Sequence, residues 1–220
     1  MRCLARHFLG SLLCAIALAI AVSPATAQQL KRDVDYRVIP QPQPVDTGDR
    51  IEVIDFFFYA CPYCNELAPH LDRWLKRKPA DVVFRHMPVV RHDSWVPLAK
   101  TYFALEAMGE VDRLHLAVYR SYHVEDLYMS QEKVIAEWAA KHGLDSEKFM
   151  AIYRSDEVKQ KVDLARKMTE AYDIQGTPSI VVDGKYLTSS SMTPGVPQVI
   201  PVIDGLVRLA RQQRLEKSAK

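Results

Sequence analysis

Two cysteines separated by two residues, Cys61 and Cys64, stand where a strand pattern changes into a helix pattern. The preceding run, residues 51–59, is rich in aromatic and β-branched residues and predicts a buried strand. Residues 62–78 have apolar side chains at helical spacing. This order puts the first sulfur at a helix N-terminus, where unpaired N–H groups and the helix dipole stabilise a thiolate. The placement therefore predicts dithiol–disulfide exchange, for which the four-residue motif alone would be a weak indication.

Residues 1–27 have the pattern of a cleaved secretory signal peptide. Arg2 and Arg6 give a positive start, residues 8–22 are apolar, and Ala25-Thr26-Ala27 offers a small-residue cleavage site. The apolar run is shorter than the ~20 residues that span a membrane as a helix, although an uncleaved anchor is the alternative. We therefore expect an exported protein.

The mature chain would keep Cys61 and Cys64 and lose Cys3 and Cys14 with the leader. The leader also removes two of the 29 basic residues and none of the 27 acidic ones, so the mature net charge is zero. Zero charge argues against a nucleic-acid-binding protein, which normally has a basic excess. A disulfide across two intervening residues closes too small a loop to stabilise a fold much, which disfavours a purely structural pair.

The rest of the chain divides into four parts. Residues 28–49 are polar and proline-rich, which indicates an extended lead-in with a short strand at 36–39. Residues 82–90 predict a strand parallel to the first. Residues 93–173 are helical in periodicity throughout. We expect helices there at 95–108, 110–123, 131–142, 146–153 and 157–172. A final ββα unit is predicted from strands at 179–182 and 185–188 around Asp183-Gly184, and from a helix at 197–215.

The predicted class is α/β, with a βαβ unit, an all-helical block and a ββα unit. The two outer units, with the cysteine pair at the first helix, resemble the thioredoxin fold. With the helical block and the export signal, residues 45–215 are similar to the DsbA family of periplasmic thiol oxidases. The resemblance also rests on Pro69 within the first helix, on Asp55 and on Gly176-Thr177-Pro178 before a strand. It implies a thioredoxin-like domain of residues 50–92 and 174–216, with a helical insertion at 93–173.

The resemblance and the helix geometry together make Cys61 the exposed acidic thiol and Cys64 its buried partner. Pro62 takes the first helical position, where its missing N–H costs nothing. Many relatives carry histidine where this chain has Tyr63. Tyrosine offers no cation to the Cys61 thiolate, which predicts a milder oxidant than a histidine-bearing relative.

Asp55 lies mid-strand among apolar residues, where a carboxylate is costly unless it is paired or functional. The functional interpretation is a buried proton donor or acceptor for Cys64, as the resemblance implies. The alternative, compatible with the first, is an ion pair with Arg85 on the next strand.

The resemblance further implies a cis peptide at Thr177–Pro178, with the Thr177 backbone pairing with an extended substrate segment. Most such relatives have a branched aliphatic residue there. Thr177 is instead similar to thioredoxin and isomerase members.

The predicted reaction is the donation of a disulfide to exported proteins in the periplasm, followed by reoxidation by a DsbB-like quinone-coupled membrane protein. We expect a monomer with no dissociable cofactor. A closed zinc site needs four ligands, and His70, His86 and His92 are interpreted as surface or hydrogen-bonded residues, so we expect no metal. The alternatives are a disulfide isomerase or reductase of the same fold, and a non-catalytic chaperone with a structural disulfide.

Overall fold

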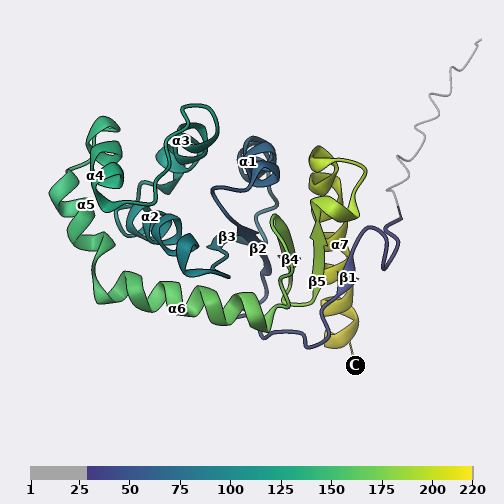
Figure 1. The fold of residues 1–220 in the computed structure, drawn as a ribbon. Coiled ribbons are helices and arrows are strands. Elements are labelled where there is room, and N and C mark those ends of the chain that lie inside the picture. Colours follow the sequence, from purple (N-terminus) through teal and green to yellow (C-terminus); the bar gives the residue numbers. More distant parts are fainter. Residues whose placement is uncertain (1–28, 220) are drawn as a thin grey trace, which may run out of the picture.

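The computed structural model describes residues 29–219, and Figure 1 shows them built around one sheet. The predicted leader at 1–27 lies outside the described residues. Within them the sheet has five strands in the order β1-β5-β4-β2-β3. These are β1 (Arg37–Val38), β2 (Ile51–Phe57), β3 (Val82–Pro88), β4 (Ser179–Val182) and β5 (Tyr186–Ser189).

Strand β2 runs through the middle of the sheet, and all seven of its residues are buried. It pairs in parallel with β3 and antiparallel with β4. The aromatic and β-branched run is suited to this position because both of its faces and both of its edges are covered. The parallel strands are joined by α1 (Pro62–Leu75), the predicted crossover helix. β2 ends before the predicted boundary at residue 59, because the Phe58 carbonyl already accepts the N–H of Cys61 in the turn into α1.

Asp183 and Gly184 form the predicted turn between β4 and β5. Their φ angles are 56° and 62°, the left-handed conformation that a tight hairpin turn of type I′ requires. A Cβ atom on Gly184 would lie 2.1 Å from the backbone oxygen of Gln43. The lead-in that passes the hairpin therefore also requires glycine at this position.

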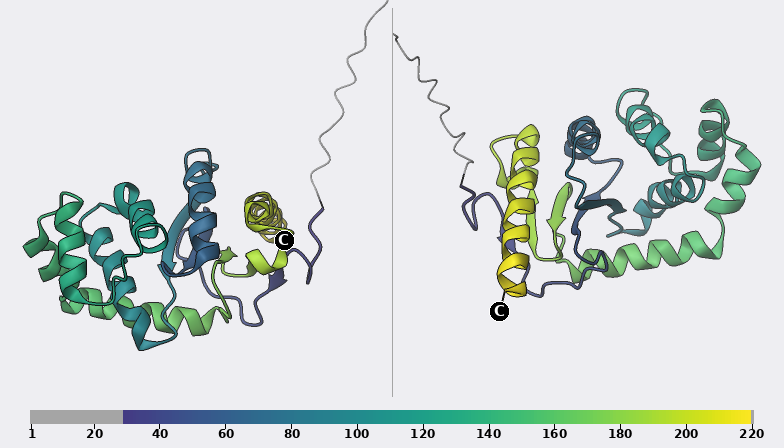
Figure 2. Two further views of the ribbon diagram at one scale, coloured as in Figure 1. Left: turned by 45° about the horizontal axis from the view of Figure 1, so that its top comes forward. Right: turned by 180° about the vertical axis from the view of Figure 1, so that it is seen from behind.

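Helices cover both faces of the sheet. On one face lie α1 and α7 (Val199–Ser218), which Figure 2 shows in its left view above the sheet. The apolar sides of these helices share a core with alternate residues of the strands. Leu67 and Trp74 of α1 and Ile203 of α7 pack there with Val53 of β2 and Ile180 of β4. The opposite residues of β2, Ile54 and Phe56, belong to a second core that continues into the helical block. The period-two alternation of a strand makes this division.

Five helices occupy the chain between β3 and β4, and Figure 1 shows α2 to α5 beyond the β3 edge while α6 leads back toward β4. They are α2 (Val96–Ala107), α3 (Val111–His123), α4 (Glu132–Lys141), α5 (Ser146–Tyr153) and α6 (Asp156–Ala171). Each predicted boundary is correct to within one residue. Two of these helices begin with a side-chain cap. The Asp145 carboxylate accepts the N–H of Lys148 at the start of α5, and the Ser155 hydroxyl accepts the N–H of Val158 at the start of α6.

Two arginines of α7 join this helix to neighbouring loops. Arg211 makes a bidentate ion pair with Asp81, at 2.8 and 2.9 Å. Arg214 pairs with Asp183 of the hairpin turn and donates to the Gly48 carbonyl. Helical periodicity in the sequence does not reveal these contacts, because it does not show which loops lie beside the C-terminal half of a helix. Among residues 29–219, no helix combines the length and the apolar character needed to cross a bilayer.

Candidate active site

Cys61 is the N-cap residue of α1, in an extended conformation with Pro62 at the first helical position. Its carbonyl accepts the first helical hydrogen bond, from the Asn65 N–H at 3.0 Å. The first turn holds no acidic residue that would oppose a negative charge. The Cys61 sulfur therefore lies at the positive end of the helix, as the strand-to-helix placement predicted.

Both cysteines are free thiols in this structure, and the two sulfurs differ sharply in acidity. Hydrogen bonding from Cys64 is the largest cause that lowers the Cys61 pKa, to about 5. Partial burial of the Cys61 thiol raises its pKa and so opposes this effect, whereas hydrogen bonds from the backbone N–H groups of Cys64 and Tyr63 lower the pKa further. In its protonated form Cys61 donates to the Thr177 carbonyl oxygen at 3.2 Å, a contact that the thiolate gives up.

Cys64 lies one turn further along α1 and is buried. Burial raises the pKa of its thiol well above 9, and the hydrogen bond to Cys61 and the negative charges of Cys61 and Asp55 add to the effect. One turn of helix therefore separates a thiol that is ionised near neutral pH from one that is protonated.

Asp55 is buried on β2, 3% exposed, on the same face of the strand as Val53. That face packs against α1, so the carboxylate lies beneath the helix that carries Cys64. Its Oδ2 atom accepts a hydrogen bond from His86 Nδ1 at 2.9 Å, while Oδ1 is buried and makes no hydrogen bond to the described residues.

The alternative partner for Asp55, Arg85, is wrong. In the parallel register Asp55 lies opposite His86, whereas Arg85 lies opposite Ile54 and so points to the other face. Arg85 there pairs with Glu52 at 3.1 Å. The register of β2 on β3 decides between two neighbouring residues, because a shift of one position would move each side chain to the other face.

A buried polar cluster that the sequence did not reveal continues from Asp55. The side chain of His86 is 12% exposed, and its ring centroid lies 4.3 Å from that of His115 on α3. Tyr59 is hydrogen-bonded through its hydroxyl to Nδ1 of His115 at 2.8 Å. The sequence predicted His86 to be either a surface residue or a hydrogen-bonded one. The structure shows that it is hydrogen-bonded and largely buried. His115 gave no signal, because it is a lone histidine in a helical pattern.

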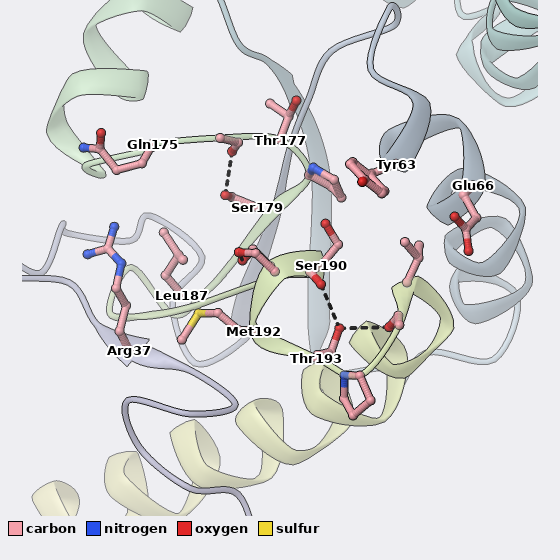
Figure 3. Close-up of a pocket in the computed structure, with 17 residues that line it drawn as sticks. Arg37, Tyr63, Glu66, Gln175, Thr177, Ser179, Leu187, Ser190, Met192 and Thr193 are labelled. Atoms are coloured by element: carbon pink, nitrogen blue, oxygen red, sulfur yellow. Dashed lines mark hydrogen bonds between the residues drawn. The ribbon is translucent and has the colours of Figure 1, made fainter.

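Thr177 and Pro178 join through a cis peptide bond, as predicted, directly before β4. They line a groove of about 620 Å³ beside the cysteines. Figure 3 shows Tyr63 and Glu66 of α1 on one side of it, and Thr177 and Ser190 facing them. Tyr63 is 58% exposed, so its ring is open to a bound molecule. Residues 29–219 contain no group of three or more side chains placed to bind a metal.

Comparison with known proteins identifies the architecture. A sequence model of the DSBA-like thioredoxin domain matches residues 52–199. The chain belongs to this family. The family assignment confirms the predicted α/β thioredoxin fold and makes the protein a disulfide oxidoreductase that acts by thiol:disulfide interchange.

Relatives and solved structures agree with the assignment. The chain is 31% identical to the thiol:disulfide interchange protein DsbA of Burkholderia cepacia, over 96% of this chain and 100% of the relative. It is 35% identical to that of Bordetella parapertussis, over 91% and 96%. The crystal structure of Pseudomonas aeruginosa DsbA superposes with a TM-score of 0.80 at 30% identity, and the match covers 84% of this chain and 96% of that one.

Proposed function

We propose that this DSBA-like protein is a periplasmic oxidase that donates the Cys61–Cys64 disulfide to exported proteins. The observation that carries the proposal is the difference in pKa between the two thiols, about 5 for Cys61 and well above 9 for Cys64. A stabilised Cys61 thiolate makes the dithiol form stable relative to the disulfide. The disulfide is therefore a good oxidant of other thiols.

The transfer takes two exchanges. A substrate thiolate attacks Cys61 Sγ, a mixed disulfide forms, and the electron pair of the broken bond goes to Cys64 Sγ. A second substrate thiolate then attacks the substrate sulfur of the mixed disulfide and expels Cys61 as a thiolate. The substrate has lost two electrons and the enzyme has gained them. The low pKa of Cys61 accelerates the second step, because an acidic thiol is the better leaving group.

Asp55 is the proposed proton partner of Cys64. The raised pKa of Cys64 means that this sulfur takes up a proton after it leaves the disulfide, and loses it again on reoxidation. Asp55 is buried next to it with a free oxygen, which supports this role.

Thr177 and Pro178 are the proposed substrate contacts. The groove that they line is adjacent to the Cys61 sulfur, because Thr177, one of its lining residues, accepts a hydrogen bond from Cys61 through its carbonyl oxygen. An extended segment of an unfolded substrate would pair with this backbone and add a strand beside the cysteines. Pro62 and Tyr63 support the site from the first turn of α1.

The predicted leader at 1–27 supports the proposed location, and the family to which the chain belongs supports the proposed partners. We propose export to the periplasm, with reoxidation of the dithiol by a DsbB-like membrane protein that passes the electrons to a quinone. We also propose that residues 50–92 and 174–216 form the thioredoxin-like unit and residues 93–173 its helical insertion.

Oxidation of a reduced, unfolded two-cysteine protein by the purified disulfide form tests the activity. The wild-type protein should transfer its disulfide stoichiometrically. Cys61→Ser should transfer none, and Cys64→Ser should not catalyse turnover. A Cys61→Ser variant that still oxidises the substrate would overturn the proposal.

Tyr63 and Thr177 favour the isomerase or reductase as the second candidate. The state of the two cysteines in cells separates the candidates. Trapping with an alkylating reagent should find them oxidised if the protein is an oxidase, because it must be held ready to donate. A predominantly reduced pair would indicate the isomerase or reductase.

A further inference from the structure

We propose that Arg37 and Arg91 clamp the linker of residues 173–176 and thereby hold the Thr177 backbone in place for a protein substrate. The linker joins the end of α6 to the cis peptide before β4. The inference deepens the proposed function and rests on it, because it concerns the backbone with which the substrate is proposed to pair. Both arginines are positioning residues, since they act through the linker and not on the sulfurs.

The carbonyl groups of the linker are bound by side chains. Residues 173–176 belong to no helix or strand. The Asp173 carbonyl accepts a hydrogen bond from the Arg37 guanidinium at 2.6 Å, and the Gln175 carbonyl accepts one from the Arg91 guanidinium at 2.6 Å. Hydrogen bonds from a charged donor are stronger than neutral ones. The two arginines therefore supply the fixed partners that a helix or a strand would find in its own backbone.

The hydrogen-bonded carbonyls continue to the reactive sulfur. The Gly176 carbonyl accepts the Ser179 hydroxyl at 2.7 Å, the bond dashed beside Ser179 in Figure 3. The Thr177 carbonyl accepts the Cys61 thiol at 3.2 Å. Only Gly176 stands between the clamped Gln175 and Thr177 in the chain. The position of the Thr177 backbone beside the sulfur therefore depends on where the linker is held.

The two arginines reach the linker from opposite edges of the sheet. Arg37 lies on β1, the strand at one edge, and also pairs with the Asp173 carboxylate at 3.0 Å. Arg91 lies in the segment that follows β3, the strand at the other edge. Loss of either arginine would leave one end of the linker without its partner, while the other end stays attached.

Arg91 lies outside the substrate groove, whereas Arg37 is one of the residues that line it. Arg91 lines a separate cleft of about 390 Å³ beside α6. Its guanidinium donates to the Gln175 carbonyl and, at 3.5 Å, to the Ile174 carbonyl. A change at Arg91 therefore alters the groove through the linker.

A fixed linker lowers the cost of binding an extended substrate. Strand addition requires that the backbone on both sides be ordered, and a mobile linker would have to be ordered at the expense of affinity. A small dithiol reacts at the Cys61 sulfur without pairing with this backbone. The clamp therefore matters for protein and peptide substrates and not for small thiols.

The test compares two reductants of the disulfide form in Arg91→Met, which has no side-chain donor. The rate constant with a reduced cysteine-containing peptide should fall about fivefold or more, because an unclamped backbone residue must be ordered on binding. The rate constant with dithiothreitol should stay unchanged, as should alkylation of the Cys61 thiolate in the reduced form. Arg91→Lys, which keeps one donor, should give a peptide rate between those of Arg91→Met and the wild type.

Arg166→Ala is the matched control. Arg166 lines the same cleft as Arg91 but donates to Asp93, which is 96% exposed, and such surface pairs contribute little. Both rate constants should be unchanged in this variant. The effect of Arg91→Met should also be the same at low and high salt, because the clamp is a direct contact within the protein. Attraction of an acidic peptide to the cleft would instead be screened by salt.

The outcomes separate the clamp from the proposed function. An unchanged peptide rate in Arg91→Met, an equal fall with dithiothreitol, or an effect that disappears in high salt overturns the clamp. A wild-type protein that transfers no disulfide in a Cys61-dependent way overturns the proposed function.

A measurement on the unsubstituted protein covers the case in which Arg91→Met does not fold. In NMR spectra at low temperature the Nη groups of Arg91 should give separate signals, because the bond to the Gln175 carbonyl slows rotation of the guanidinium. Arg211, held at two nitrogens by Asp81, is the internal reference. One averaged signal for Arg91 under conditions in which Arg211 gives separate ones overturns the clamp.

Discussion

The Sγ atom of Cys61 lies 3.2 Å from the backbone oxygen of Thr177, although 116 positions separate the two residues in the chain. The sheet brings them together, because β2 leads directly to Cys61 and its antiparallel partner β4 begins directly after Thr177–Pro178. The reactive sulfur is therefore set between the start of a helix and an exposed stretch of backbone. Four predictions follow from this arrangement and from the contacts that support it.

Removal of the Cys64 thiol should raise the pKa of Cys61. Hydrogen bonding from Cys64 is the largest cause of the low value, so Cys64→Ala should move the pKa upward from about 5, by roughly one unit or more. Thiolate absorbance at 240 nm against pH measures the change. Cys61→Ser, which lacks the titrating group, is the control, and an unchanged midpoint in Cys64→Ala would contradict the assigned cause.

Stability of the dithiol form should depend on pH. The folded pKa of Cys61, about 5, is below its unfolded value of about 8.5. The thiolate therefore stabilises the reduced protein fully above about pH 8.5, and this stabilisation is lost as pH falls through about 5. Cys64 is protonated in both states below pH 8.5 and adds no slope there.

Thermal unfolding of both forms between pH 5 and pH 8.5 checks this dependence. The Tm of the reduced protein should rise relative to that of the oxidised protein as pH increases. A protein with both cysteines replaced by serine should show no difference between samples with and without reductant. A constant Tm difference across the range would be inconsistent with an acidic Cys61.

Histidine at position 63 should make the protein a stronger oxidant. Tyr63 is exposed in the first turn of α1 and supplies no positive charge, whereas an imidazolium there would stabilise the Cys61 thiolate. Tyr63→His should lower the Cys61 pKa and raise the reduction potential by roughly 30 mV for each unit of pKa. Equilibration with glutathione measures the potential. Tyr63→Phe should match the wild type, and a His variant that is equally or less oxidising would refute the prediction.

Loss of Arg214 should destabilise the fold. Its guanidinium pairs with Asp183 in the β4–β5 turn and donates to the Gly48 carbonyl, in a largely shielded position. Arg214→Ala should lower the free energy of unfolding by about 2 kcal/mol, since charged hydrogen bonds of a half-buried group are lost. Urea denaturation measures it. Arg208→Ala, an exposed position on the same helix, should change stability by less than about 0.5 kcal/mol.

Local patterns along the chain were enough to predict the helices and strands. The cap residues Asp145 and Ser155, the Asp183-Gly184 turn and the apolar spacing of α2 to α6 are signals contained within a few neighbouring residues. The same holds for Cys61 at the start of α1, because the change from strand to helix pattern occurs at that residue. These features are determined by the sequence alone.

The partners of the buried charges were decided only by the tertiary structure. Asp55 contacts His86 and not Arg85 because the register of β2 on β3 places one side chain on each face, and nothing local in the chain specifies that register. The same packing places His115 beside His86 and brings Thr177 to Cys61. Contacts between distant segments depend on how whole elements pack, so a pattern read along one segment does not contain them.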